Sequence, residues 1–180
     1  MASRRPLVLA ALVAVGLLIG ARGTPGSAQS ASPMAGTPIT DPLAGITSET
    51  LGSGVPSATP GQTFELARVT FAPQATIPFH TNPGAQLVSA LSGELTLMAT
   101  QARGQLMRPA APSGTPAPPA AVDPGASIVL HPGEGFFFPH GTVHLLHNAG
   151  TEPAVIMVAT LFAADQPDLV RSNEQGTPTP

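Results

Sequence analysis

From residue 46 onwards, apolar and polar residues alternate in short segments, a pattern typical of β-strands. In residues 63–71 the apolar members are Phe64, Leu66, Val69 and Phe71. Gly, Pro and Asn separate the segments, and no segment shows a helical period bounded by caps. The pattern therefore predicts an all-β sandwich or barrel. Six further strands are expected at 86–91, 94–100, 127–131, 135–138, 143–147 and 154–162.

Three Pro-rich segments interrupt or flank this pattern. Residues 29–45 and 166–180 are small, polar and rich in Pro, Ala and Thr, and bury too little apolar surface to offset chain entropy. We expect them to form a flexible tether and a flexible tail. Residues 108–125 hold many prolines, which lack the donors of a strand ladder, so we expect an enlarged surface loop there. The folded domain then spans residues 46–165.

The first 28 residues have the pattern of an export signal. Arg4 and Arg5 precede an apolar run at 7–19, and Gly26-Ser27-Ala28 offers small residues for cleavage. The run is short for a membrane-spanning helix. We therefore expect residues 1–28 to be removed and the chain to be exported, secreted or extracytoplasmic. An anchor that is never cleaved is the alternative, and the choice between a general and a twin-arginine export route stays open.

Composition narrows the classes of partner. Three of the seven Lys and Arg residues lie in residues 1–28, which leaves four basic against ten acidic residues and a net charge of −6 for the processed chain. Such a chain offers no basic surface for nucleic acid and no polybasic patch for a membrane. The sequence contains no Cys, so a disulfide, a thiolate metal site and a cysteine nucleophile are all excluded.

Four polar residues stand at spacings that bring them together. His80 and Asn82 are two apart, so on a strand they point to the same face. A Pro-Gly turn follows, and Gln86 then shares a face of the next strand with Val88. His144 begins a strand after the tight turn at 139–142. If these faces line one barrel interior, the four side chains converge.

Two runs of the sequence resemble the two motifs of the cupin family. The second motif is filled at every position, from Gly133 through Pro139-His-Gly141 and His144 to Asn148. The first matches in spacing, from His80 through Gln86 to Gly93. The resemblance covers the folded core and implies a single cupin domain, a double-stranded β-helix or jelly-roll barrel, with 108–125 as an enlarged loop between the motifs.

The same resemblance implies a metal site, and the residues depart from it. In many cupins the positions of His80, Asn82, Gln86 and His144 hold three His and one Glu, which bind a divalent metal. Here two neutral amides replace an imidazole and the carboxylate. Two imidazoles and two amide oxygens still suit one divalent transition metal such as Mn, Fe, Ni, Cu or Zn. The alternative is a hydrogen-bonded network without metal.

Two functions remain open from the sequence. The first is an exported cupin-domain protein that binds a small molecule in the barrel, with a degenerate metal site as one means of binding it. The second is a metal-dependent oxidoreductase of the dioxygenase kind, so catalysis itself is undecided. An uninterrupted apolar outer face also predicts a homodimer formed by sheet-to-sheet contact. Four further polar side chains are expected at the surface: Glu94, His131, His140 and His147. The run Phe136-Phe137-Phe138 is expected to lie in the core on one face and in an interface on the other.

Overall fold

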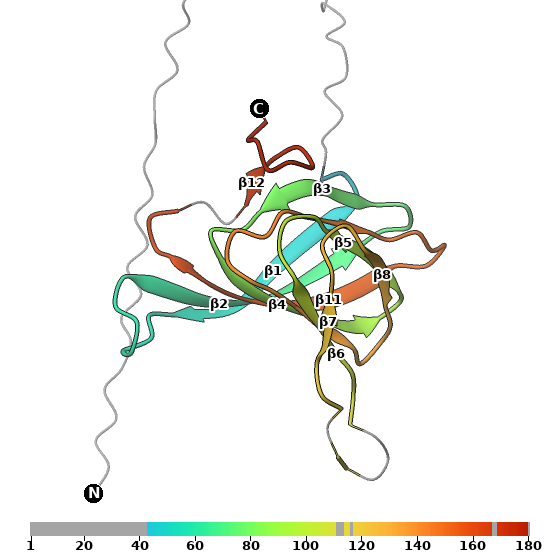
Figure 1. The fold of residues 1–180 in the computed structure, drawn as a ribbon, viewed down its shortest axis with the longest axis horizontal. Coiled ribbons are helices and arrows are strands. Elements are labelled where there is room, and N and C mark those ends of the chain that lie inside the picture. Colours follow the sequence, from blue (N-terminus) through green and yellow to red (C-terminus); the bar gives the residue numbers. More distant parts are fainter. Residues whose placement is uncertain (1–42, 111–113, 116, 167–168, 180) are drawn as a thin grey trace, which may run out of the picture. The chain divides into compact units, whose positions relative to one another are not determined.

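The computed structural model describes residues 43–110, 114–115, 117–166 and 169–179, and these form an all-β jelly roll of two antiparallel sheets (Figure 1). The predicted fold class is confirmed. No helix in these residues is long and apolar enough to cross a membrane. The expected signal (1–28) and most of the expected tether lie outside the described residues and stay predictions.

One sheet has seven strands and the other has five. The seven-stranded sheet contains, in spatial order, β1 (Ile46–Gly54), β2 (Gln62–Phe71), β11 (Ala154–Ala163), β4 (Gly84–Ser92), β9 (Gly135–Phe138), β6 (Gly104–Met107) and β7 (Ala120–Val122). The five-stranded sheet contains β12 (Val170–Arg171), β3 (Thr76–Thr81), β10 (His144–His147), β5 (Leu95–Ala99) and β8 (Ser127–Leu130).

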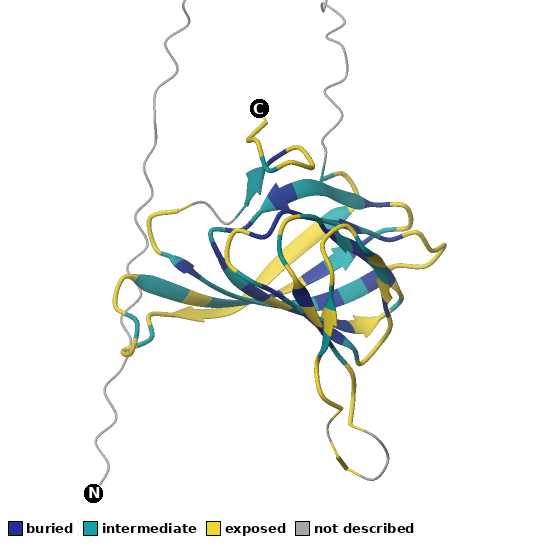
Figure 2. Ribbon diagram, viewed as in Figure 1, coloured by how far each residue is buried: buried dark blue, intermediate teal, exposed yellow. Residues whose placement is uncertain are grey.

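The core lies between the two sheets, where alternate residues of strands such as β4, β5 and β11 are buried (Figure 2). In β4 the buried positions fall at every second residue, and in β5 Leu95, Leu97 and Ala99 follow the same period. Large side chains from both sheets fill the interior: Phe71, Val88, Leu97, Leu130, Phe136 and Ile156. This period of two is why the sequence pattern located seven of the strands.

One strand departs from its expected pattern. In β2 the inward face carries Ala67, Val69 and Phe71, which are buried or nearly so. Phe64 and Leu66 lie on the opposite, outward face, and Phe64 is exposed. The four apolar residues of 63–71 therefore do not form one face, because their spacing changes parity between residues 66 and 69.

Two Pro-rich segments are more ordered than expected. Within 108–125, residues 120–122 form β7, which pairs with β6, so the expectation of a loop throughout is wrong at this proline-free stretch. The tail is not simply flexible either, because β12 pairs with β3 and Ser172 bridges Pro178. Thr100 also donates its hydroxyl to the carbonyl of Glu174, so the core supplies partners that the tail cannot supply itself.

Candidate functional site

Strands β3, β4 and β10 bring the four sequence-predicted polar residues into the barrel interior. His80 of β3 pairs directly with His144 of β10. Asn82 follows the end of β3, and Gln86 lies on the inward face of β4. All four side chains are buried, with exposed fractions between 1% and 7%. The sequence spacing therefore predicted their burial, whereas their role as metal ligands stays a prediction.

Gly84 allows β4 to run close to β11 just before Gln86. A Cβ at this position would lie 1.8 Å from the carbonyl oxygen of Leu161. Only glycine fits such an approach between two backbones. The close approach at Gly84 thus fixes the distance between β4, which carries Gln86, and the neighbouring strand β11.

The two imidazoles form a neighbouring pair with defined donors and acceptors. Their ring centroids are 4.1 Å apart. His80 Nδ1 lies 2.8 Å from the carbonyl of Pro78, and His144 Nδ1 lies 2.9 Å from the carbonyl of Thr142. A carbonyl only accepts, so each neutral ring carries its proton on Nδ1 and keeps a lone pair on Nε2. His144 Nε2 is buried and has no hydrogen-bond partner among the described residues.

Burial keeps both rings neutral. Desolvation lowers the pKa of His80 to about 4, although the hydrogen bond to Pro78 opposes it. Desolvation, together with the charge of a protonated His80, lowers the pKa of His144 to about 3, against the hydrogen bond to Thr142. Phe138 stacks on His144 with centroids 4.0 Å apart and supplies part of this apolar surrounding. The pair therefore accepts hydrogen bonds at neutral pH.

A cavity of about 250 Å³ opens beside this cluster. Its polar lining residues include His80, Asn82 and Gln86, and the Gln86 amide donates to the Thr160 hydroxyl at 3.3 Å. The rest of the wall is mostly aliphatic and aromatic. It includes Ile46, Val69, Ile77, Leu146, Ile156, Val158 and Phe162. Its volume lies just below the range of about 300–1,000 Å³ that is usual for ligand pockets.

Sequence reasoning missed one carboxylate in the cavity wall, that of Glu65. Glu65 of β2 pairs with Thr160 of β11, and Thr160 pairs with Gln86 of β4. These three residues, which we call the inner row, face the cavity side by side. The sequence indicates this position only through the alternation of strand faces. Glu65 lies an even number of residues from Ala67, Val69 and Phe71, which are buried, so it shares their face.

The donor set meets the needs of a metal ion in part. Two Nε2 lone pairs suit a late transition metal, and the amide oxygens of Asn82 and Gln86 are weak neutral ligands. Within the described residues, no group of three or more His, Cys, Asp or Glu side chains could hold an ion. The residues therefore fit the donor types of a weakly held divalent metal but lack an anionic ligand to balance its charge.

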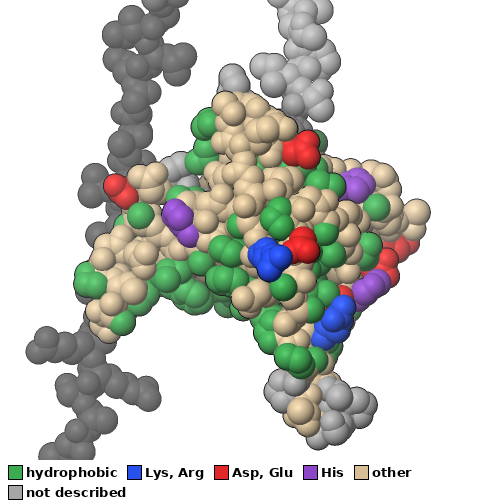
Figure 3. Space-filling model, in the orientation of Figure 1, with side chains coloured by type: hydrophobic (Ala, Val, Ile, Leu, Met, Phe, Trp, Pro, Cys, Tyr) green, Lys and Arg blue, Asp and Glu red, His purple; other side chains and the backbone are tan. Residues whose placement is uncertain are grey.

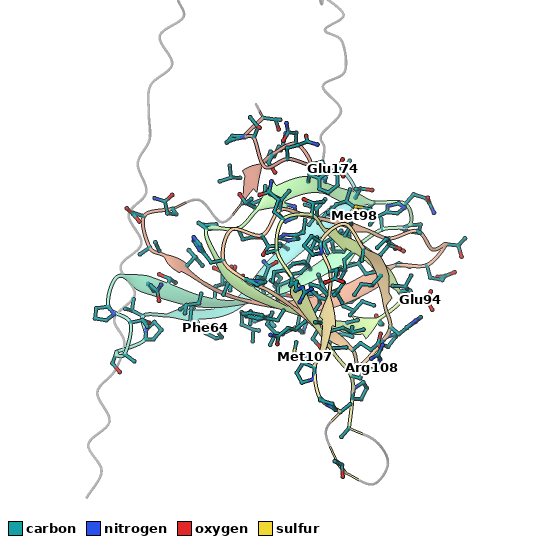
Figure 4. The ribbon with its side chains drawn as sticks, in the orientation of Figure 1. Phe64, Glu94, Met98, Met107, Arg108 and Glu174 are labelled. Carbon is teal, nitrogen blue, oxygen red and sulfur yellow. The ribbon has the colours of Figure 1, made fainter. Side chains whose placement is uncertain are left out.

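The other sequence candidates lie away from this cluster. Glu94, labelled in Figure 4, is exposed and pairs with the exposed His131 at 3.1 Å. His140 is exposed, and His147 is half-buried, with Nδ1 2.8 Å from the Thr76 hydroxyl. Of the three consecutive phenylalanines, residues 136 and 138 belong to the core and residue 137 lies on the outer face.

Comparisons with known proteins converge on one family. A family model described as Cupin matches residues 59–169. No curated protein matches the chain. Solved structures match the chain at low identity. Oxalate oxidase in complex with the substrate analogue glycolate is 24% identical, with 76% of this chain and 59% of that chain covered and a TM-score of 0.44.

Two further structures show the same degree of similarity. A cupin superfamily protein from Desulfitobacterium hafniense is 15% identical over 65% of this chain and 77% of its own, with a TM-score of 0.43. A chain from the structures of the DMSP lyases RdDddP and RnDddQII is 17% identical over 61% of this chain, with a TM-score of 0.44. This chain spans only 44% of that DMSP lyase chain and 59% of oxalate oxidase.

Proposed function

This chain belongs to the cupin family, and from that premise we propose that its barrel binds a small, largely apolar molecule through the buried histidine pair. The observation that carries the proposal is His144 Nε2, a buried acceptor without a hydrogen-bond partner in the described part of the chain. An unsatisfied buried polar atom costs about 1–3 kcal/mol. Of the two rings His80 lines the cavity and His144 packs against it, so a ligand recovers this energy where its donor reaches past His80 to His144 Nε2.

The walls of the cavity determine the remaining chemical character of the ligand. They are lined mainly by apolar side chains, with a few polar ones that include Glu65, His80 and Gln86. This combination is typical of small-molecule sites, in which apolar contact supplies affinity and a few polar groups fix orientation. A short apolar molecule with a hydroxyl or similar donor satisfies both parts of the wall.

Pentan-1-ol is a suitable probe because it joins a hydroxyl donor to a short apolar chain. We expect it to bind wild-type protein and to shift the ¹⁵N resonances of the His80 and His144 imidazoles. The variant His80→Leu should lose this binding, while His140→Leu, at an exposed position, should bind like wild type. Equal binding by all three proteins would place the alcohol elsewhere and contradict the proposal.

A divalent metal is the second candidate occupant, favoured by the same two Nε2 lone pairs. His80 and His144 would hold it, with Asn82 and Gln86 as weak oxygen ligands. Such a metal would supply Lewis acidity to a ligand bound in the cavity. The neutral ligand set predicts weak binding, and Gln86→Glu should strengthen it by adding an anionic ligand of nearly unchanged shape.

Metal content and melting temperature together test this candidate. After dialysis against Ni²⁺ or Mn²⁺, Gln86→Glu should gain metal and stability relative to wild type, as measured by elemental analysis and thermal unfolding. If the variant stays empty and becomes less stable, the carboxylate is buried without a counter-ion and the metal role is wrong. The pentanol experiment, performed with chelator present, is independent of this outcome.

A further inference from the structure

Glu65 is the one charged side chain among the described residues that line the cavity. It belongs to the inner row, two strands away from Gln86. Strands lie about 4.8 Å apart, so the backbones of Glu65 and Gln86 are separated by about 10 Å. The cavity therefore has a carboxylate on β2 at one end and His80 with the amides of Asn82 and Gln86 at the other. Thr160 lies between Glu65 and Gln86 in the inner row.

No described residue neutralises this carboxylate. Glu65 takes part in no ion pair or hydrogen bond with another described residue. Three of the four described arginines pair instead with carboxylates at the surface: Arg68 with Glu49, Arg103 with Asp123 and Arg108 with Glu134. The fourth, Arg171 on the edge strand β12, pairs in register with His80 but does not line the cavity.

A carboxylate without a counter-ion in an apolar wall gives the cavity a negative potential. Low-dielectric walls focus such a field, so a cation is attracted into the cavity and an anion is repelled. The opposite end offers acceptors rather than cations, because the imidazoles present Nε2 lone pairs. The described lining therefore has no cationic side chain to balance a carboxylate ligand, and only the neutral amides of Asn82 and Gln86 and the hydroxyls of Ser48 and Thr160 could donate to one.

We propose that Glu65 makes this cavity selective for small organic cations, with a hydrogen-bond donor separated from the cationic group by a short apolar chain, and that the cavity rejects carboxylate ligands. An amino alcohol is the simplest member of this class: its ammonium group meets Glu65 and its hydroxyl group meets His80. The inference rests on the proposed function, since it assigns the ligand class of the same cavity.

Three probes that share a chain of five carbons separate the contributions of charge and chain. They are 5-aminopentan-1-ol, pentan-1-ol and 5-hydroxypentanoate, titrated calorimetrically into the full-length protein at low ionic strength. We expect the amine to bind about tenfold more tightly than the alcohol and the hydroxy acid to bind most weakly. In Glu65→Gln the advantage of the amine should disappear, while the affinity for pentan-1-ol stays within about twofold of wild type.

Two matched variants control for charge elsewhere. Glu152→Gln removes an exposed carboxylate outside the cavity wall, and Arg171→Gln removes the arginine that pairs in register with His80. Both should keep the wild-type order of the three probes. If 5-hydroxypentanoate binds wild type as tightly as the amine, or if Glu65→Gln keeps the preference for the amine, the inference is wrong. Binding of pentan-1-ol alone leaves the proposed function standing, whereas binding of none of the probes overturns both.

Discussion

At one end of the barrel, the seven-stranded sheet has a row of polar residues on its inner face and a row of apolar residues on its outer face. The inner row across β2, β11 and β4 is polar, with a carboxylate, a hydroxyl and an amide. One residue along the same three strands, and continuing onto β9, the outer row consists of Leu66, Ala159, Leu87 and Phe137, all apolar. Hydrophobic side chains gather along the lower edge of the molecule in Figure 3, and Phe64 lies there in Figure 4.

This arrangement is the reverse of the usual one, in which polar residues face water and apolar residues face the core. A slip of one residue in register would bury the outer row and expose the inner row. The neighbouring part of the sheet prevents it, because Ala67, Val158 and Val88 pair across the same three strands and are buried. We propose that the polar row serves a ligand and the apolar row serves a partner.

The largest effect on stability is expected at Gly84, because β4 and β11, which carry parts of both rows, approach each other closely there. In Gly84→Ala the new Cβ would meet backbone atoms of Leu161, which cannot move without shifting β11. We expect the free energy of unfolding to fall by more than about 3 kcal/mol, as measured by urea denaturation. The matched control is Gly52→Ala, because a Cβ there has no atom within 4 Å. Equal stability of the two variants would show that the rows are not held by this close approach.

Acid should lower the stability of the folded protein through the two buried histidines on the inner side of the barrel. The pKa values of His80 and His144, about 4 and about 3, lie below the value of 6.5 expected in the unfolded chain. The unfolded state therefore binds more protons as pH falls, and the stability present above pH 6.5 is lost progressively toward pH 4. Each histidine contributes a loss of roughly 2 kcal/mol between pH 6.5 and pH 5.

Stability curves measured by urea denaturation at pH 7, 6 and 5 test this prediction. His144→Leu should flatten the dependence, because it removes one of the two buried bases. His140→Leu changes an exposed histidine and should follow wild type. A wild-type curve that is flat from pH 7 to pH 5 would mean that the imidazoles are hydrated or already paired.

The sequence predicted the inner side of this fold better than its edges. Strands with one buried face, such as β4 and β11, alternate clearly and were located within a few residues. The first strand was missed because it lies at a sheet edge, where nearly every residue is exposed and no alternation is required. The strands β7 and β12 were missed because their partners, rather than their own composition, hold them in place.

The site shows the same limit. The spacing of His80, Asn82, Gln86 and His144 predicted that they would meet, since local strand periodicity and the motif resemblance both apply. Glu65 could not be found in this way, because its neighbour in space, Thr160, is far away in the sequence. Strand order decides such contacts, and strand order is not encoded in the alternation of any one segment.

A smaller effect is expected from making the inner row apolar at one position. Gln86→Leu removes the single hydrogen bond of 3.3 Å to Thr160 and puts a side chain of similar size against the apolar wall. We expect the free energy of unfolding to change by less than about 1 kcal/mol, and the affinity for pentan-1-ol to fall. A loss of stability of about 3 kcal/mol or more would instead assign Gln86 a structural role and remove the contrast between the rows.

The smallest effect on stability is expected on the outer face, where we propose that a second copy of this chain docks against the outer row. The one ion pair at its margin, Arg68 with Glu49, is neutral overall, so two copies meet without like-charge repulsion. In Leu87→Gln the monomer should unfold within about 0.5 kcal/mol of wild type, because this side chain is 40% exposed. Light scattering should nevertheless show a dimer for wild type and a monomer for the variant.

Val129→Gln on the other sheet, at a similar exposure of 43%, should stay dimeric. A monomeric wild type at micromolar concentration would leave the apolar row without its partner and contradict the contrast between the faces.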